Sequence, residues 1–552
     1  MSNVNINGVK LKKINNKEIL ETLKESIIYN SNKDLNKELF DIKTSDFLND
    51  KENLKTDVIV ENKEIINSQN LDLEKNTIKK ILLVTSEAQP FCATGGMADV
   101  CGSLPKEIRK INTGIDIRVI MPLYSVIPKD IRDKLKYIGY NYTTLSWRRE
   151  YAGVFEYEEN GVTFYFIDNE RYFKRDCGIY GYYDDGERFA FFSKSVLEIL
   201  PVINFFPDII HSNDWHSALI PVYLKTAYFD NRYKNIKTIL TIHNISYQGR
   251  FGQEILEDVL GIDKKFKNLL SYDGDINILK AGIVCADKIT TVSPSYAQEI
   301  KTKEHSAGLH HIIKENSYKL IGILNGIDYD FYNPETDKII YHNYNAENLD
   351  EKKENKKALQ REFNLEINEE IPIIGFCSRM NKMKGFDLIK QIMEKVIIEN
   401  KVQFVGVGCG DREYEDYFKY LNYKYKGRVS ISLGFSNHLG RKIYSGADIY
   451  IMPSISEPCG LSQIIASKYG VIPIIRETGG LKDTIKDFGC EGGGNGYTFS
   501  SANAYDFEYL IKRAISDYKD KKGWREKVQK VMSKDFSWSK TAGNYIDTYL
   551  SL

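Results

Sequence analysis

The chain has 552 residues, which is too long for one hydrophobic core and predicts two or more domains. Its 76 Lys and Arg residues balance its 76 Asp and Glu residues, so no overall basic field exists to attract nucleic acid or an anionic membrane. The eight cysteines include no C-x-x-C pair, which argues against a zinc site and against a secreted disulfide framework.

The amino-terminal segment is polar. MSNVNINGVKLKK lacks the apolar core of a signal peptide, and no stretch of the chain approaches the roughly 20 apolar residues of a membrane span. We therefore expect a soluble, cytoplasmic protein. Residues 1–78 are dominated by Asn, Lys, Glu, Asp and Ile and predict a low-complexity extension, for which a dispensable tail is favoured over a partner-binding segment.

From residue 79 onwards, short apolar runs alternate with helical patterns. KKILLVTSE predicts a strand, and the loop after it brings Gly95 and Gly96 to the start of a helix, where free N–H groups favour an anion. A β excursion is expected around VFEYEENGVTFYFID, and the series continues to DKITTVSPSYAQEI. Repeated strand–helix units predict a doubly wound parallel sheet over residues 79–330.

A second series of strands and helices begins after a Lys/Glu/Asn-rich connection. It runs from IPIIGFCSRM to the helical pattern LKDTIKDF and predicts a second Rossmann-like domain over residues 331–525. The last segment, residues 526–552, is helical and is expected to pack back across both domains. The fold class is therefore α/β, with two doubly wound domains and a ligand site in the cleft between them.

Glu457 stands in the segment around which the second domain is organised. The apolar run ADIYIM predicts a buried strand, and a helical pattern resumes at Leu461. Glu457 therefore falls on a strand-to-helix loop, shaped by Pro458 and Gly460, at the sheet edge where ligands bind in open α/β domains. An acid directed at a ligand and an exposed loop acid are both compatible with this stretch alone.

Two cations and a helix start share that predicted edge. Arg379 and Lys384 follow the first strand of the second domain in SRMNKMKG and could clamp a diphosphate, although solvated surface charges are the alternative. A helix start that also favours an anion is supplied by Thr478, Gly479 and Gly480.

Other motifs, present or absent, bear on further classes of function. VGVGCGD has the spacing G-x-G-x-G and is interpreted as a structural turn, not as a dinucleotide fingerprint. No Walker A, H-E-x-x-H or G-x-S-x-G sequence occurs, which removes the simplest NTPase, metalloprotease and hydrolase functions. DWH at residues 214–216 and IHN at residues 242–244 end neighbouring strands, and their histidines are either structural or part of a site.

From Ile81 to the carboxyl terminus the chain resembles the bacterial glycogen synthases and plant starch synthases. The resemblance rests on TGGMADVCGSLPK, HSNDWHSALIPVYL, NILKAGIVCADKITTVSP, SRMNKMKGFDL, EPCGLSQ and TGGLKDT, which occur in the order of the family. It implies a GT-B architecture and the transfer of glucose from ADP-glucose to the non-reducing end of an α-1,4-glucan such as glycogen, with retention. It implies no obligatory metal and no cofactor besides the donor. The oligomeric state cannot be deduced from the sequence.

The resemblance also assigns roles to residues. It implies that Arg379 and Lys384 bind the donor diphosphate, that Glu457 is the acid needed for activity, and that His216 lies beside the transferred sugar. The substrate-binding positions that it implies are Gly95, Gly96, Asp99, Asn277, Cys459, Gly460, Leu461, Thr478, Gly479 and Gly480.

Two positions depart from the pattern of the family. Ala93 stands where a lysine usually precedes the paired glycines, and Ile455 and Ser456 replace the usual Arg-Phe before Glu457. The loss of two cations leaves two alternatives: a synthase that uses UDP-glucose, and a glucan-binding relative with impaired catalysis.

Overall fold

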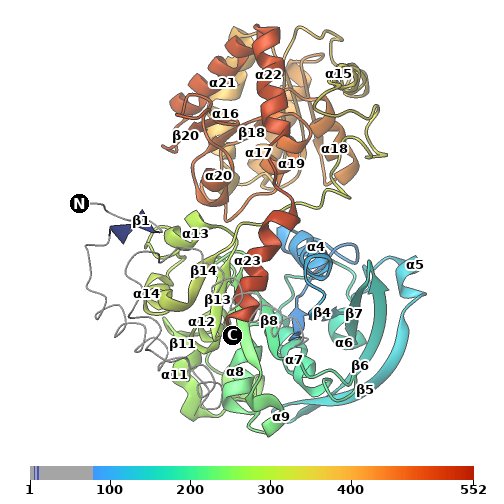
Figure 1. Ribbon diagram of the computed structural model, residues 1–552, viewed down its shortest axis with the longest axis vertical. Coiled ribbons are helices and arrows are strands. Elements are labelled where there is room, and N and C mark those ends of the chain that lie inside the picture. The colour runs from blue at the N-terminus through green and yellow to red at the C-terminus, as the bar shows by residue number, and fades with distance from the viewer. Residues whose placement is uncertain (1–4, 7–8, 11–78) are drawn as a thin grey trace, which may run out of the picture. The chain divides into compact units, whose positions relative to one another are not determined.

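The computed structural model describes residues 5–6, 9–10 and 79–552 (Figure 1). The extension predicted over residues 1–78 lies outside these residues, apart from two short antiparallel strands, β1 (Asn5–Ile6) and β2 (Val9–Lys10). Two open sheets organise the rest of the chain. The first is built from strands between residues 79 and 322, and the second from strands between residues 373 and 499.

The first sheet has nine strands in the order β14-β13-β9-β8-β3-β4-β7-β6-β5. The seven from β14 to β7 run parallel, whereas β6 is antiparallel to both β5 and β7, as the predicted β excursion requires. The strands are β3 (Lys79–Val84), β4 (Ile115–Pro122), β5 (Lys136–Leu145), β6 (Arg148–Glu159), β7 (Val162–Asp168), β8 (Ile209–Asn213), β9 (Lys237–Ile242), β13 (Lys288–Thr291) and β14 (Leu320–Gly322).

Helices and a small three-stranded sheet connect these strands. The helices are α4 (Gly96–Ile111), α5 (Lys129–Arg132), α6 (Glu170–Phe173), α7 (Asp185–Glu198), α8 (Leu219–Thr226), α9 (Asn231–Lys234), α10 (Ile255–Asp258), α11 (Lys267–Leu270), α12 (Ile278–Cys285), α13 (Pro294–Glu299) and α14 (His310–Glu315). The small sheet consists of β10 (Arg250–Phe251), β11 (Ser271–Tyr272) and β12 (Asp275–Asn277).

The second sheet has six parallel strands in the order β17-β16-β15-β18-β19-β20. The strands are β15 (Ile373–Cys377), β16 (Gln403–Gly408), β17 (Val429–Leu433), β18 (Ile449–Met452), β19 (Ile472–Arg476) and β20 (Tyr497–Phe499). The helices are α15 (Asp350–Glu362), α16 (Phe386–Glu399), α17 (Arg412–Lys424), α18 (Asn437–Gly446), α19 (Ser462–Lys468), α20 (Gly479–Thr484), α21 (Ala504–Tyr518), α22 (Lys521–Met532) and α23 (Trp538–Leu550).

Burial accounts for the parallel arrangement of the central strands in both sheets. The central strands β8 and β18 are buried at every position. Helices cover both faces of each sheet, so the side chains of these strands do not reach solvent. Each sheet has its own apolar cluster, and the sequence prediction of two α/β units is confirmed. VGVGCGD belongs to the end of β16 and the turn into α17, as expected for a structural turn.

The carboxyl-terminal segment forms two helices that pack on different sheets. α22 contacts α19, α21 and β19 of the second sheet, whereas α23 contacts α4 beside the first sheet (Figure 1). Between these two helices, Phe536 O accepts a hydrogen bond from Ile327 N at 2.8 Å. The backbone there pairs with the segment around Ile327 instead of joining α22 and α23 into one helix. On α23, Trp538 and Tyr549 are buried in an apolar cluster with Ile81 of β3.

One helix differs in extent from its sequence pattern. The pattern LKDTIKDF predicts a helix over residues 481–488, but α20 begins at Gly479 and ends at Thr484. Ile485 is extended, and Asn495 fixes the end of the helix because its side chain donates to Thr484 O at 3.0 Å. The β-branched residues at positions 484 and 485 favour this early end.

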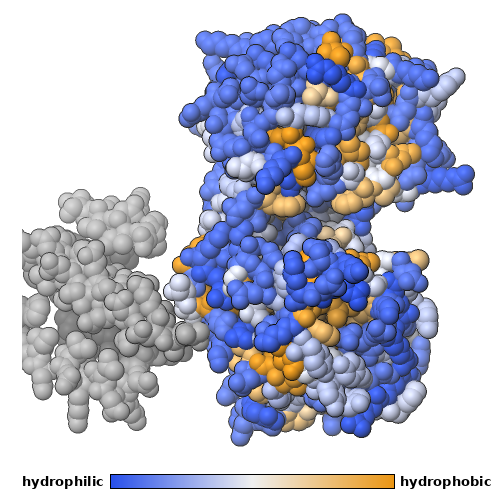
Figure 2. All heavy atoms as spheres, turned by 90° about the vertical axis from the view of Figure 1, so that its right-hand side faces the viewer, coloured by the Kyte–Doolittle hydropathy of each residue, from blue (hydrophilic) through white to orange (hydrophobic). Residues whose placement is uncertain are grey.

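Among the helices that the structure describes, none is long and apolar enough to cross a membrane. The face drawn in Figure 2 is mainly hydrophilic, and its hydrophobic residues form small separate patches.

Candidate functional site

Glu457 lies in the loop between β18 and α19, at the carboxyl edge of the second sheet, and only 6% of its surface is exposed. Its Oε2 atom accepts hydrogen bonds from Lys384 Nζ at 2.5 Å and from Ser454 Oγ at 3.1 Å. Burial of a carboxylate is unfavourable unless a cation and hydrogen-bond donors compensate it, and both are present here. The structure therefore joins two of the predicted site residues in one ion pair.

A tight turn carries Lys384 to this acid. The 3-10 turn η3 (Lys382–Lys384) follows Asn381, whose side chain accepts a hydrogen bond from Lys384 N at 3.0 Å. Gly385 comes next at a φ of 76°, and a Cβ atom there would lie 2.0 Å from Pro453 O. Because only glycine tolerates both the backbone conformation and this approach, the loop after β15 packs directly on the end of β18.

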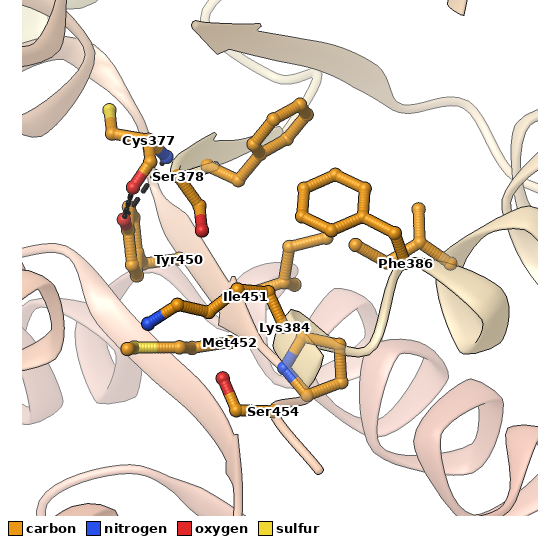
Figure 3. A pocket seen from close by; sticks show the side chains of 11 residues that line it. Cys377, Ser378, Lys384, Phe386, Tyr450, Ile451, Met452 and Ser454 are labelled. Carbon is orange, nitrogen blue, oxygen red and sulfur yellow. Dashed lines mark hydrogen bonds between the residues drawn. The ribbon is translucent and has the colours of Figure 1, made fainter. Parts of the chain in front are cut away.

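A small pocket lies beside the ion pair (Figure 3). Tyr450 fixes one wall, since its hydroxyl accepts from Cys377 N and donates to Cys377 O, both at 3.0 Å. Lys384 and Ser454, the two partners of Glu457, both line the pocket. The full lining is Phe376, Cys377, Ser378, Lys384, Phe386, Ile389, Tyr450, Ile451, Met452, Pro453 and Ser454.

Arg379 precedes Lys384 on the same loop but is exposed. Within residues 79–552 its guanidinium makes no hydrogen bond or ion pair, so it is available to an anion. The structure thus places Arg379 on the predicted sheet edge without joining it to the network of Glu457.

Glu87 is a buried acid of the first sheet that the sequence analysis did not single out. It lies in the loop between β3 and α4, is 3% exposed, and its Oε2 atom accepts from Thr94 N at 2.5 Å and from Thr94 Oγ1 at 2.9 Å. Burial raises the pKa of Glu87, and hydrogen bonds from Thr94 and Gly95 together with the charge of Arg379 oppose that rise. Its position directly after the strand in KKILLVTSE was the signal that could have identified it.

The paired glycines begin α4 as predicted, with Gly95 at the N-cap and Gly96 as the first helical residue. A Cβ atom on Gly95 would meet no other atom within 4 Å, so open space adjoins the start of the helix. A Cβ atom on Gly96 would lie 3.5 Å from Leu461 Cδ1. Two predicted substrate-binding residues, Gly96 and Leu461, are therefore neighbours, although one follows a strand of the first sheet and the other a strand of the second.

Asp99 lies in the first turn of α4. Its pKa is raised to about 7, chiefly by burial and in addition by the charges of Glu87 and Asp328. The negative charge of Asp99 is therefore disfavoured beside the glycine loop.

His216 and Asp214 follow β8. Asp214 has a φ of 52°, and its Oδ1 accepts from His243 N at 2.7 Å, which ties the ends of β8 and β9 together. His216 stacks on Tyr180 with 4.6 Å between ring centroids, and burial lowers its pKa to about 3 with a smaller contribution from Arg188. Among the described residues its Nδ1 atom has no hydrogen-bond partner. His216 is therefore a neutral, buried imidazole.

Asn277 is engaged in the fold. It is fully buried, caps α12 by accepting from Lys280 N at 2.9 Å, and donates to Gln248 Oε1 at 2.7 Å. The structure thus satisfies both its oxygen and its nitrogen with groups of the protein itself.

The helix start at residues 478–480 is also occupied by protein groups. Glu299 of α13 accepts from Gly479 N at 2.8 Å and from Thr478 Oγ1 at 3.3 Å. This start therefore holds a carboxylate of the chain itself where an anion of the ligand was expected. Sequence analysis did not identify Glu299, because a single acid near the end of a short helix carries no distinguishing pattern.

The remaining residues of the loop shape it from within. Cys459 is 4% exposed, and Gly460 adopts a φ of 73° in which a Cβ atom would lie 2.5 Å from Gln463 Oε1. Both residues therefore contribute through the backbone of the loop that carries Glu457.

Comparison with known proteins identifies both halves of the chain. The starch synthase catalytic domain family matches residues 80–315, and the glycosyl transferases group 1 family matches residues 359–531. The chain is 46% identical over 478 residues to a glycogen synthase of Clostridium botulinum (strain Alaska E43 / Type E3). It is 48% identical over 477 residues to a glycogen synthase of Caldicellulosiruptor saccharolyticus. Each alignment covers 86% of this chain and 99% of the relative.

A solved structure shows the same architecture. The catalytic domain of starch synthase IV from Arabidopsis thaliana, bound to ADP and acarbose, is 32% identical and superposes with a TM-score of 0.80 over 86% of this chain and 99% of that one. The GT-B fold implied by the resemblance is confirmed. The chain belongs to the family of glycogen synthases and starch synthases, which are glycosyltransferases.

Proposed function

We propose that the protein transfers glucose from ADP-glucose to the non-reducing end of an α-1,4-glucan, with retention of configuration at the anomeric carbon. The observation that carries the proposal is the buried ion pair of Lys384 and Glu457 at the sheet edge, in a chain of this family. The ADP and acarbose bound to the related starch synthase IV domain support a nucleotide donor and a glucan-like acceptor.

The residues fit the charges that the reaction develops. Breaking the bond between glucose C1 and the phosphate leaves positive charge on the sugar and negative charge on the diphosphate. The exposed guanidinium of Arg379 and the ammonium of Lys384 stabilise the diphosphate in this proposal. Glu457 and the neutral imidazole of His216 support the sugar.

Retention follows from attack on the face that the diphosphate leaves. The acceptor hydroxyl forms the new bond to C1, and its proton passes to an oxygen of the departing diphosphate. The reaction then needs no dedicated base and, as proposed, no cofactor besides the donor. A cytoplasmic location, where sugar nucleotides are made, is part of the same proposal.

The test is incorporation of labelled glucose into a glycogen primer by the purified protein. We expect incorporation from ADP-glucose and little from UDP-glucose. Incorporation from UDP-glucose alone would replace the proposed donor, and the absence of incorporation from either nucleotide would indicate a glucan-binding relative without catalysis.

A further inference from the structure

Three contacts join α13 to the segments around Glu457. Ser293, the N-cap of α13, donates to Pro458 O at 2.6 Å. Ser295 donates from its backbone N at 2.8 Å and from its Oγ at 2.6 Å to the carboxylate of Asp483 in α20. Glu299 accepts from Gly479 N at 2.8 Å. The short helix α13, which belongs to the same half of the chain as the first sheet, is thus bound to the loop that carries Glu457 and to α20.

The start of α20 in turn lies directly beneath the loop of Glu457. Gly480 N donates to Glu457 O at 3.2 Å and to Pro458 O at 3.1 Å. Cβ atoms on Gly479 and Gly480 would lie 2.0 Å from Glu457 O and 2.2 Å from Cys459 O. Because no side chain separates these two backbones, any displacement of the first turn of α20 moves the main chain that carries Glu457.

Glu299 supplies the only side-chain carboxylate among the described residues that bonds to this first turn. Its Oε1 and Oε2 atoms each accept from Thr478 Oγ1 at 3.3 Å in addition to the bond from Gly479 N. Free N–H groups and the helix dipole favour a negative charge at this position. Thr478 is 1% exposed, so water does not replace the carboxylate easily.

We propose that Glu299 is a positioning residue for the proposed glucosyl transfer. It acts through α20 and the backbone of residues 457–459 and keeps Glu457 at its bond with Lys384. Glu299 does not touch the reacting atoms in this arrangement. The inference rests on the proposed function, since it assigns to Glu457 a role in that reaction.

The test combines kinetics with hydrogen exchange in the full-length protein. In Glu299→Ala we expect kcat to fall about tenfold with ADP-glucose and glycogen, because Glu457 is then held less firmly, while KM for the donor changes less than about threefold. Amide exchange over residues 455–461 and 477–481 is expected to accelerate. Glu299→Gln keeps an oxygen that can accept from Gly479 N, and we expect it to restore kcat to within about threefold of the wild type.

Gln298→Ala is the matched control, because it truncates the preceding, exposed residue of the same helix. Normal kcat and normal exchange in Glu299→Ala would overturn the proposal, as would a Glu299→Gln variant that loses as much activity as Glu299→Ala. If Glu299→Ala does not fold, Glu299→Asp, whose shorter side chain withdraws the carboxylate, is expected to show the same losses, and wild-type behaviour would refute the role. Exchange is measured without substrate, so it tests the contact even if the wild type transfers no glucose.

Discussion

Two strand-to-helix loops hold a buried acid each, and they compensate its charge differently. Glu457, after β18, pairs with the ammonium of Lys384, whereas Glu87, after β3, accepts hydrogen bonds from Thr94 and Gly95 and makes no ion pair among the described residues. Ala93, beside that threonine, is exposed and carries no charge where a lysine is usual in the family. The comparison teaches that the cations proposed for the donor diphosphate come from the second sheet, while the first sheet offers N–H groups and space.

Among the substitutions that test this difference between the two loops, removal of Lys384 is expected to have the largest effect. Lys384→Ala leaves Glu457 buried without a cation and removes a contact to the leaving diphosphate, so we expect kcat to fall on the order of a hundredfold or more. The measurement is the initial rate of glucose incorporation from ADP-glucose. Lys382→Ala, on the exposed side of the same turn, serves as the control and should stay near the wild-type rate; equal losses in the two variants would contradict a specific role for Lys384.

A side chain at Gly479 tests how firmly the loop of Glu457 is supported. Gly479 has a φ of 43°, and the Cβ atom of Gly479→Ala would lie 2.0 Å from Glu457 O. We expect a loss of stability of about 2 kcal/mol and a fall in activity of about tenfold, because the loop must move. Thermal unfolding and incorporation rates measure these effects. Gly543→Ala in α23 meets no atom within 4 Å and should be neutral or slightly stabilising; a similar loss there would remove the argument from the loop.

Asp99, in the first turn of α4, allows a test through the pH dependence of the free energy of unfolding. Its pKa is raised to about 7 in the folded protein, so the stability that its protonated form contributes is present below pH 3.8 and is lost as the pH rises through 7. Asp99→Asn does not titrate, and its stability relative to the wild type should therefore increase by about 2 kcal/mol between pH 5 and pH 7. Unfolding by urea at several pH values tests this, and a constant difference would show that Asp99 ionises normally.

Restoring the missing cation of the first loop is expected to have the smallest effect. Ala93→Lys places an ammonium beside the glycine loop, and we expect the donor KM to fall several-fold while kcat and the products stay unchanged. Ala93→Gln supplies similar length without charge and controls for packing. A change of linkage in the product would mean that this loop contacts the acceptor and not the donor.

Much of the fold was predictable because it depends on local patterns. The apolar runs ending at Val84 and Met452 are strands that are buried on both faces, so composition alone identified them and placed Gly95 and Glu457 in the strand-to-helix segments that follow. For Lys384 and Glu457 the sequence predicted a shared sheet edge but not their contact, because a sequence contains no distance between two loops.

The rest depends on contacts between distant segments. Glu299 is 180 residues from Gly479, and no pattern around either residue indicates the bond between them. For Asn277 the sequence suggested a ligand contact, but whether an asparagine caps a helix or faces a substrate depends on where the neighbouring backbone lies. Burial of Glu87 likewise results from tertiary packing, which the loop composition does not encode.

The last helix has a consequence for biosynthesis. Trp538, Tyr545 and Tyr549 of α23 cover Ile81 and Val100, and the Tyr549 hydroxyl bonds His211 Nδ1 at 2.8 Å. The earliest strand of the first sheet thus acquires its final covering only when residues 538–550 have left the ribosome. A nascent chain that has already completed its second sheet therefore still exposes apolar surface on its first sheet.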